Sequence, residues 1–338
     1  MPLGNDNIVA ASVVAAPGEA PLLATFFLIT YNQERYIREA LEGAFAQTYS
    51  PLEIVVSDDC SKDGTFRIVE EMCAAYHGPH RIVLIRNKVN LGLIGHINTI
   101  TSRSSGELIV YAAGDDISLP ERTEKLVERY LATGRQASLI HSSVILIDDD
   151  GRPEGTRIPP LLEHGMALAD MALSSALITG ATSAFTRKIE ESFGPIRYDK
   201  SIEDLVMGFR SALTGGLECI EEPLVLYRHE VGITAMPDKR RQTYRQKVAR
   251  EVRNKETFLA VLSQRQDDLR RIGNTDLYPV IKAGRAKALL QRKVWLGNSR
   301  FIRLVFYAAK RGLLTVFFES YFRRKKWQLF FPLRKLIS

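Results

Sequence analysis

Cysteines are few and long apolar runs are absent in this chain, and each absence excludes a class of protein. The three cysteines form an odd set with no CxxC spacing, which argues against a disulfide framework and a zinc site and favours a reducing compartment. No stretch reaches the roughly 18 apolar residues of a membrane-spanning helix. Residues 1–21 lack a basic segment, so we expect a flexible N-terminal arm and no signal peptide.

Charge is unevenly distributed along the 338 residues. The net charge is +7, yet residues 292–338 hold twelve lysines and arginines and one acid, Glu319, so the rest of the chain is net acidic. The basic character therefore belongs to the tail, and we expect no nucleic-acid partner. With 45% hydrophobic and 25% charged residues, the composition is that of a globular protein able to bury a core.

Apolar stretches of strand length alternate with helical patterns through the first half of the chain. The first of them is continuously apolar, as expected of a strand that is buried on both faces. The order predicts an α/β fold with a doubly wound, mainly parallel sheet and a helical C-terminal extension. Strands are expected at Leu22–Thr30, Ile54–Val56, Arg81–Ile85, Leu108–Ala112, Ser138–Ile147 and Glu222–Tyr227, and later helices at Glu203–Leu213, Pro237–Arg271 and Tyr278–Leu296.

Two acidic pairs stand where apolar strands end. Asp58-Asp59 follows the second expected strand, and Asp115-Asp116 follows the fourth. Carboxylates at the C-terminal ends of buried strands lie in the crevice where open α/β sheets bind ligands. Two like-charged pairs there would repel each other unless a cation or a donor-rich ligand joined them. The arrangement predicts a metal ion and a phosphorylated ligand.

The segment Thr30–Glu34 ends the first strand and opens a helix. Backbone N–H groups there can meet a nucleotide, and Asn32 and Glu34 can hydrogen-bond a base or ribose, although an ordinary strand-to-helix turn has the same pattern. The segment lacks the GxGxxG of a dinucleotide-binding fold. In the loop after the second strand, Ser61 and Asp63 suit helix capping, whereas the acidic pair beside them is harder to explain in that way.

An ordered set of motifs resembles glycosyltransferase family 2 across roughly residues 22–235. The resemblance implies a GT-A fold, a nucleotide-sugar donor, a divalent metal and inversion at the anomeric carbon. The region would divide into a nucleotide-sugar half, 22–120, and an acceptor half, 121–235. The motifs are Thr30-Tyr31-Asn32, Gln47-Thr48-Tyr49, Asp58-Asp59-x-Ser61-x-Asp63-Gly64-Thr65, Asn90-Leu91-Gly92, Ser105-Gly106-Glu107 and Gly114-Asp115-Asp116 running on to Pro120.

By that resemblance one set of residues would contact the nucleotide sugar, with Asp59 at the base. Asp115 matches the metal-binding end of the family's DxD motif, whose first position is occupied here by Ala113. Asp116 and His229 are expected as further ligands of a Mg²⁺ or Mn²⁺ ion, which would stabilise the departing diphosphate. The expected donor contacts are Thr30, Tyr31, Asn32, Glu34, Asp58, Asp59, Asn90, Gly92, Gly114, Asp115 and Arg228.

The pair Glu203-Asp204 begins the helix expected at 203–213. Acids at this position can simply cap the positive end of a helix dipole. The resemblance instead makes Asp204 the general base that deprotonates the acceptor hydroxyl, with Glu203 beside it, and the helix N-terminus is expected to keep Asp204 ionised. The segment Gly180–Phe185 resembles the family's acceptor-side loop. For His229, a lone histidine, the alternative to metal binding is a structural role.

Aromatic and aliphatic residues interleave with cations in the tail, 291–338, which follows a polar helical region, 236–290. This mixture is typical of interfacial helices on anionic lipid, so we expect residues 295–335 to bind a membrane surface. The alternative is a helical subdomain that packs on the catalytic body or on a second subunit. An oligomer therefore stays possible.

The sequence thus predicts a metal-dependent, inverting glycosyltransferase, peripheral at the cytoplasmic face of the plasma membrane. It would move a sugar from a nucleotide diphosphate sugar, with a UDP-sugar favoured, to a hydroxyl of a lipid-linked or cell-surface polysaccharide acceptor. A nucleotidyltransferase on a similar sheet would need a Gly-rich, Lys- or Arg-bearing loop after the first strand, which Thr30–Glu34 does not supply. A non-catalytic, membrane-associated scaffold is the other alternative, which Ala113 leaves open.

Overall fold

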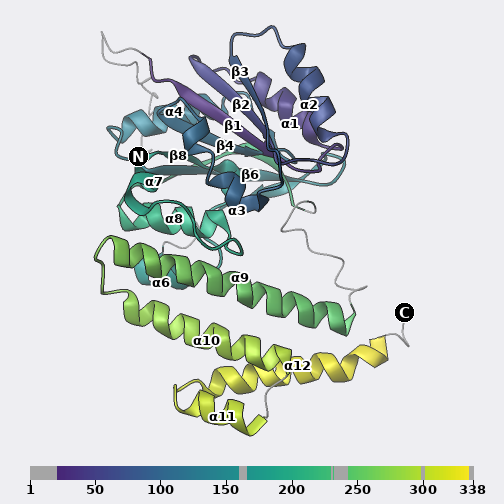
Figure 1. The fold of residues 1–338 in the computed structure, drawn as a ribbon, viewed down its shortest axis with the longest axis vertical. Coiled ribbons are helices and arrows are strands. Elements are labelled where there is room, and N and C mark those ends of the chain that lie inside the picture. The colour runs from purple at the N-terminus through teal and green to yellow at the C-terminus, as the bar shows by residue number, and fades with distance from the viewer. Residues whose placement is uncertain (1–20, 160–165, 230, 232–242, 298–300, 335–338) are drawn as a thin grey trace, which may run out of the picture.

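The computed structural model describes residues 21–159, 166–229, 231, 243–297 and 301–334. One nine-stranded sheet forms the upper part of the molecule, in the order β3-β2-β1-β4-β8-β6-β9-β5, with β7 paired to β6 (Figure 1). The predicted α/β fold is confirmed. Nearly all of the N-terminal arm lies outside the described residues, and so does the predicted boundary between residues 235 and 236.

The half of the sheet that comes first in the chain is parallel. β1 (Ala24–Thr30) lies between β2 (Leu52–Asp58) and β4 (Leu108–Ala113), and β3 (Arg81–Arg86) pairs with β2. Every residue of β1 and β2 is buried, because helices cover both faces of these strands. The C-terminal ends of the parallel strands therefore form one edge.

Beyond β4 the sheet is mixed, which the predicted parallel order did not include. The short strand β8 (Ala184–Thr186) is inserted between β4 and β6 (Leu139–Ile147) and runs antiparallel to both. β9 (Leu217–Arg228) pairs in parallel with β6 and antiparallel with β5 (Ile117–Ser118), while β7 (Pro153–Arg157) folds back on β6. Strands as short as β5 and β8 carry too little periodicity for a sequence pattern to indicate them.

Helices cover both faces of the sheet and build an apolar core on each (Figure 1). Phe26 and Leu28 of β1 face α1, α2 and α4, whereas Phe27 and Ile29 face α3, α6, α7 and α8, as the two-residue period of a strand requires. The helices run Ile37–Phe45 (α1), Thr65–Ala74 (α2), Gly92–Ile97 (α3), Arg122–Ala132 (α4), Leu168–Leu173 (α6), Lys188–Phe193 (α7) and Glu203–Leu213 (α8), with 3-10 turns at Thr101–Arg103 (η1) and Gly180–Thr182 (η2).

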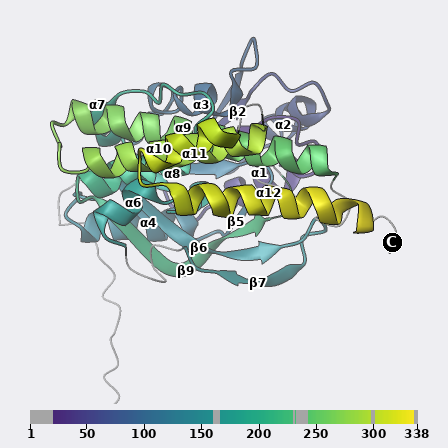
Figure 2. The same ribbon diagram turned by 90° about the horizontal axis from the view of Figure 1, so that it is seen from below.

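Among the residues that the structure describes after the sheet, four helices stack beneath α8 (Figures 1 and 2). The predicted bounds of α8 and α10 match those of the structure. α9 contributes Val261, Leu262 and Leu269 to the same core as α8, so it is continuous with the sheet domain. Among the helices that the structure describes, none is both long and apolar enough to cross a membrane. The four run Tyr244–Arg271 (α9), Tyr278–Leu296 (α10), Phe301–Ala309 (α11) and Leu314–Arg334 (α12).

Candidate active site

The loops that follow β1 and β2 are joined by hydrogen bonds. The Asn32 N–H donates to Ser61 Oγ (2.9 Å), and Asn32 Oδ1 accepts from the Lys62 N–H (2.9 Å). Glu34 Oε2 accepts from the Gly64 N–H (2.6 Å). Asn32 has a left-handed backbone conformation (φ 52°), which asparagine adopts more readily than most residues. Two of the predicted contact residues thus fix the shape of the two loops.

Thr30 and Gly114 meet at the ends of β1 and β4. Thr30 Oγ1 donates to Gln33 Oε1 (2.8 Å), and the Gly114 N–H donates to the Ile29 carbonyl (2.9 Å). A Cβ atom at Gly114 would lie 2.6 Å from Gln33 Oε1 and 2.8 Å from Thr30 Oγ1, so a side chain does not fit there. Tyr31 is 41% exposed, and its ring is accessible to a ligand at this edge of the sheet.

Asp59 organises the loop that precedes α3. Its Oδ1 accepts from Asn87 Nδ2 (2.8 Å) and from the Leu91 N–H (2.9 Å), and its Oδ2 accepts from the Gly92 N–H (3.0 Å). Asn90 Oδ1 accepts from the same Gly92 N–H at 2.9 Å. Both oxygens of this buried carboxylate are therefore engaged within the protein. Its predicted contact with the base stays a prediction.

Asp58 is buried more completely than its neighbour. Its side chain has no exposed area; Oδ2 accepts from the Ser61 N–H at 2.9 Å and lies 3.6 Å from Arg86 Nε. Within the described part of the chain, Oδ1 has no hydrogen-bond partner. The carboxylate thus holds the turn after β2, and its contact with the donor stays a prediction.

The Asp115-Asp116 turn is supported by Arg228 from the end of β9. The Arg228 N–H donates to Asp116 Oδ1 (2.9 Å), and its Nη1 donates to the Asp115 carbonyl (2.8 Å). Nη2 pairs with Glu39 Oε2 at 2.6 Å, and the guanidinium lies over the Tyr36 ring. Arg228 is only 2% exposed, so its visible role is to support the turn, and its contact with the donor stays a prediction.

Both carboxyl groups of this turn have raised pKa values. Burial raises the pKa of Asp115, while a Gln33 hydrogen bond and Arg228 oppose the change. The pKa of Asp116 is raised well above its ordinary value by burial and, next, by Asp115. Because a nearby cation stabilises buried carboxylates and oxygen ligands suit hard ions, this pair fits a divalent cation.

Tyr111 of β4 is a buried residue close to the pairs Asp115-Asp116 and Glu203-Asp204. The sequence analysis gave it no role. Burial raises the pKa of its phenol well above the ordinary value, and Glu203, Asp115, Asp116 and Asp204 add to the effect. The Tyr111 N–H donates to the Ser183 carbonyl (2.9 Å), just after Gly180, which packs on Glu203 and Asp204, so the fold brings the start of α8 near β4. The available signal was a single tyrosine within an aliphatic strand.

Arg122, at the start of α4, is a second residue that was missed. It is fully buried; Nη1 donates to Ser118 Oγ (2.7 Å), and Nη2 donates to the carbonyls of Tyr111 (2.6 Å) and Ala181 (2.8 Å). Burial lowers its pKa to about 9, and Asp116 opposes that change. A buried cation near Asp116 therefore ties β4 to η2.

Glu203 and Asp204 open α8 with unpartnered oxygens. Glu203 Oε2 and Asp204 Oδ1 are buried without a hydrogen-bond partner among the residues that the structure describes. Burial, followed by the charge of Glu203, raises the pKa of Asp204 to about 8. Burial thus opposes the ionisation of Asp204 that the helix N-terminus is expected to favour. A pKa near neutrality suits a group that accepts a proton.

The predicted acceptor-side loop packs directly on this pair. A Cβ atom at Gly180 would lie 2.7 Å from Glu203 Oε1 and 3.4 Å from Asp204 Cβ. The backbone of η2 therefore lies close beside the two acids, and a side chain at residue 180 would displace the Glu203 carboxylate.

α9 holds the first turn of α8 through Arg265. This buried side chain donates through Nε and Nη2 to the Leu205 carbonyl (3.2 and 2.8 Å), and through Nη1 to the carbonyls of Ala172 and Ser174 (3.0 and 2.9 Å). Burial lowers its pKa to about 9, and Asp204 opposes the change. Arg265 therefore links α6, α8 and α9 close to the candidate base.

A buried ion pair makes a second link between α8 and α9. Arg210 Nε and Nη2 lie 2.9 Å from the two oxygens of Asp268, and Gln264 Nε2 donates to Asp268 Oδ1 at 2.9 Å. Removing one partner of such a pair leaves an uncompensated buried charge, which costs about 3–5 kcal/mol. The position of the helix that carries Asp204 thus depends on α9.

His229, the third predicted metal ligand, contacts the Glu154 carboxylate of β7 through Nε2. The described residues contain no group of three His, Cys, Asp or Glu side chains placed to hold one metal ion. Asp115 and Asp116 suit a divalent cation by their chemistry, whereas coordination by His229 stays a prediction.

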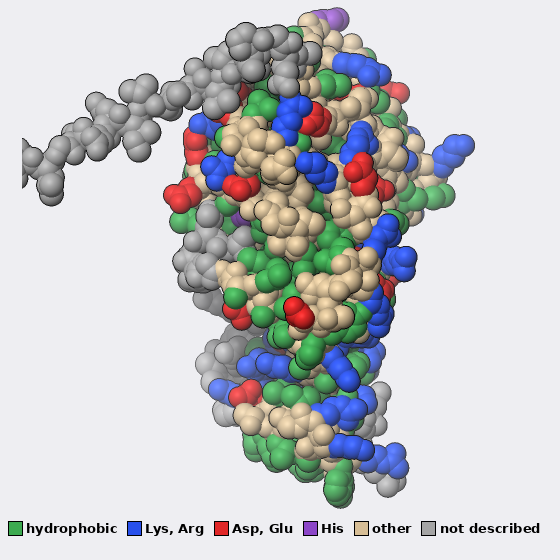
Figure 3. All heavy atoms as spheres, turned by 90° about the vertical axis from the view of Figure 1, so that its left-hand side faces the viewer, with side chains coloured by type: hydrophobic (Ala, Val, Ile, Leu, Met, Phe, Trp, Pro, Cys, Tyr) green, Lys and Arg blue, Asp and Glu red, His purple; other side chains and the backbone are tan. Residues whose placement is uncertain are grey.

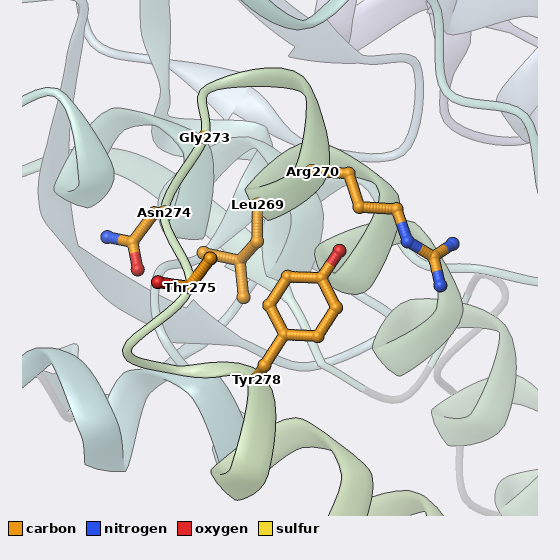
Figure 4. Close-up of a pocket in the computed structure, with 6 residues that line it drawn as sticks. All are labelled: Leu269, Arg270, Gly273, Asn274, Thr275 and Tyr278. Carbon is orange, nitrogen blue, oxygen red and sulfur yellow. The ribbon is translucent and has the colours of Figure 1, made fainter.

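A small pocket lies at the turn between α9 and α10 (Figure 4). None of the predicted site residues lines it. The candidate site is therefore defined by the acidic pairs at the strand ends and not by this pocket. Its lining residues are Leu269, Arg270, Gly273, Asn274, Thr275 and Tyr278.

Residues 25–194 match the family model described as glycosyl transferase family 2. The match includes the parallel strands, the acids at their ends and η2. The chain therefore belongs to glycosyltransferase family 2, as the motifs predicted.

Two relatives match over much of the chain. The putative glycosyltransferase EpsE of Bacillus subtilis is 30% identical over 180 residues, which make up 53% of this chain and 63% of that protein. The succinoglycan biosynthesis protein ExoO of Rhizobium meliloti is 30% identical over 216 residues, 61% of this chain and 60% of that protein. The chain thus spans less than two thirds of the length of either relative.

Solved structures share the fold. Residues 1–349 of S. aureus TarS in complex with UDP-GlcNAc give a TM-score of 0.55 at 15% identity, covering 90% of this chain and 92% of that one. The mannosyltransferase PcManGT from Pyrobaculum calidifontis, solved with GDP-Man and Mn²⁺, gives 0.51 at 15% identity, covering 89% and 86%. Likeness at this identity shows the fold alone, and the predicted GT-A fold is confirmed.

Proposed function

We propose that the chain is an inverting glycosyltransferase that moves one sugar from a nucleotide diphosphate sugar to a hydroxyl group of a glycan acceptor. The observation that carries the proposal is that the acids after β4 and those that open α8 lie near one another. Arg122 bonds to the carbonyls of Tyr111 and Ala181, and the neighbouring Gly180 packs against Glu203 and Asp204. Such a transfer needs charge stabilisation on the leaving diphosphate and a proton acceptor for the attacking hydroxyl. The pair Asp115-Asp116 suits the stabilisation of charge, and the pair Glu203-Asp204 suits the acceptance of the proton.

The nucleotide is proposed to lie over the joined loops after β1 and β2. The exposed Tyr31 ring offers a stacking surface for the base, and Asp59 keeps the Asn90–Gly92 segment in place beside it. A UDP-sugar is the favoured donor, since TarS was solved with UDP-GlcNAc. A guanosine diphosphate sugar is the alternative, since PcManGT was solved with GDP-Man.

Asp115, with Asp116 beside it, is proposed to hold a Mg²⁺ or Mn²⁺ ion, and His229 is a further candidate ligand. Mn²⁺ in the PcManGT structure supports the choice of metal. When bound, the ion would supply positive charge to the departing diphosphate. Because Ala113 replaces the first acid of the DxD motif, binding would depend on the two carboxylates that remain.

Asp204 is proposed as the general base. Its carboxylate takes the proton of the acceptor hydroxyl as the hydroxyl oxygen attacks the anomeric carbon, and the bond from that carbon to the diphosphate breaks on the opposite face. The product therefore has inverted configuration. Burial and, next, the charge of Glu203 keep the pKa of Asp204 high, and the backbone of Gly180 shapes the acceptor side.

The acceptor is proposed to be a lipid-linked or cell-surface polysaccharide intermediate, because ExoO is named as a succinoglycan biosynthesis protein. We place the protein peripherally at the cytoplasmic face of the plasma membrane, with residues 295–335 on anionic lipid, because that segment is strongly basic. An oligomer is compatible with this arrangement.

The test is to incubate the purified full chain with a panel of nucleotide sugars and to measure release of the nucleoside diphosphate without an acceptor. We expect slow hydrolysis of one donor that requires Mg²⁺ or Mn²⁺ and that Asp115→Asn weakens strongly. Asp170→Asn, an exposed acid of α6, is the control and should hydrolyse at the normal rate. Absence of donor binding and hydrolysis across the panel would favour the non-catalytic scaffold.

A further inference from the structure

The hairpin of α11 and α12 has a buried inner side. Leu304, Ala308 and Phe317 pack with Leu290 and Val294 of α10 in a core that is separate from the two cores of the sheet. The tail therefore packs on the rest of the protein. A helical subdomain of this kind was the alternative to membrane binding in the sequence analysis. This packing engages only one side of the hairpin, so it does not exclude a membrane contact on the other.

The outer side of the hairpin carries exposed apolar residues at helical spacing. Ile302 and Phe306 stand four residues apart on α11 and are 66% and 72% exposed. Leu314, Phe318 and Phe322 repeat that spacing on α12, and Phe322 is 64% exposed. Residues four apart lie on one face of a helix, so each helix has an exposed apolar stripe.

Aromatic contacts join the start of α11 to the stripe on α12. The ring of Phe301 lies 5.0 Å from that of Tyr321, which lies 5.9 Å from that of Phe322, and Phe322 lies 6.2 Å from Phe318. In Figure 3 hydrophobic side chains gather at the lower end of the molecule, with Lys and Arg side chains beside them. We call the set of exposed large apolar residues on α11 and α12 the outer hairpin face; its members are Phe301, Ile302, Phe306, Leu314, Phe318 and Phe322.

The charge around the outer hairpin face is almost entirely positive. Residues 301–328 hold seven lysines and arginines and one acid, Glu319. Exposed members of this set include Arg303, Lys310, Arg323 and Lys326. A second copy of the chain would present the same positive charge to this face and be repelled, whereas an anionic lipid surface would complement it.

We propose that the outer hairpin face inserts at the acyl boundary of an anionic phospholipid bilayer, with the surrounding cations on the lipid headgroups. Aromatic and aliphatic side chains beside Lys and Arg are the pattern of helices that lie in the membrane interface. The inference rests on the proposed membrane location and specifies it. Membrane binding comes from the outer side of a packed hairpin and not from the whole of residues 295–335.

The experiment is sedimentation of the full chain with vesicles of phosphatidylcholine, with and without phosphatidylglycerol. Binding should require the anionic lipid. Ile302→Ser, Phe306→Ser and Phe322→Ser should each weaken partitioning about tenfold, since each removes a large apolar group from the interface. Ile158→Ser is the matched control, because Ile158 is also an exposed isoleucine but follows β7, and it should bind like the unchanged chain.

Charge is tested separately. Lys310→Gln and Lys326→Gln should each weaken binding to the anionic vesicles about fivefold, at roughly 1 kcal/mol per cation near the surface. Arg67→Gln, an exposed cation of α2, should leave binding unchanged.

Three results would overturn the proposal. The first is unchanged vesicle binding by Ile302→Ser and Phe306→Ser, and the second is equal binding to neutral and anionic vesicles. The third is a concentration-dependent dimer that Ile302→Ser dissociates while vesicles bind nothing, which would make the face a contact between copies. Donor hydrolysis in vesicle-free buffer should be the same in all tail variants, so failure of this proposal is distinguishable from failure of the proposed reaction.

Discussion

Asp59, directly after β2, is buried, and Asp204, in the first turn of α8, is partly buried with one buried oxygen, and the partners of the two carboxylates differ. Asp59 accepts three hydrogen bonds, from Asn87, Leu91 and Gly92. Asp204 Oδ1 has no partner within the described part of the chain, and its pKa is raised to about 8 by burial and by Glu203. Buried polar groups are normally satisfied, so an unsatisfied one marks a place where structure is held ready for a ligand or for chemistry. We infer that Asp59 maintains shape and Asp204 reacts.

The largest effect is expected from Asp204→Asn. General-base catalysis contributes about 10²–10⁴-fold, so transfer should fall by roughly a thousandfold while the affinity for the donor is unchanged. Transfer is measured with a labelled nucleotide sugar, and donor affinity by calorimetry. Asp170→Asn is the matched control. Equal losses of transfer and donor binding would remove Asp204 from the role of base.

The next effect concerns pH. Because Asp204 must be deprotonated to accept a proton and its pKa is raised to about 8, transfer should rise with pH and level off above about pH 8. At pH 6 the rate should be about a hundredfold below the plateau. Glu203→Gln removes the neighbouring charge and should move the rise to lower pH. Glu191→Gln, an exposed acid of α7, should leave the rise in place.

A smaller effect is expected from Asp59→Asn. The amide has one acceptor oxygen where the carboxylate has two, so at least one of the three hydrogen bonds is lost. The free energy of unfolding should fall by about 1–3 kcal/mol, and KM for the donor should rise because the loop before α3 loosens. Chemical denaturation and steady-state kinetics measure the two quantities. A variant with normal stability and a raised KM would place Asp59 on the donor itself.

The last effect concerns stability and has the opposite sign. A carboxyl whose pKa is higher in the folded than in the unfolded protein contributes stability below its unfolded pKa, and that stability is lost as pH rises toward the folded pKa. Asp204→Asn removes this loss, so its Tm should exceed that of the unchanged protein, by a margin that grows between about pH 4 and pH 8. Calorimetric scans across that range test it; a lower Tm at pH 8 would mean that Asp204 is stabilised when charged.

The sequence predicted the parts of the fold that local patterns control. The bounds of α8 and α10 and the parallel strands could be recognised because their periodicity is long and regular. β8 could not, since three residues carry no usable period and its place between β4 and β6 depends on contacts distant in sequence. The acids at the strand ends were found because parallel strands end at one edge.

The roles of the buried arginines could not be predicted. Arg122, Arg228 and Arg265 look like surface cations in the sequence, because arginine is almost never fully buried without partners. Their partners are mostly main-chain carbonyls of Tyr111, Asp115 and Leu205, which carry no sequence signal. Buried polar residues also explain why the sequence pattern of α9 indicated a separate polar region, 236–290. In the structure, the buried side of α9 is part of the core of the sheet domain.

The hydrogen bonds of Arg265 have a consequence for how the chain can be divided. The segment that matches the family model ends at residue 194, before α8, which carries Asp204, and well before Arg265. Exchange of that segment alone between relatives would therefore transfer the loops proposed to bind the donor without the proposed base or the guanidinium that holds its helix. The unit that recombination must keep whole extends from β1 to the end of α9.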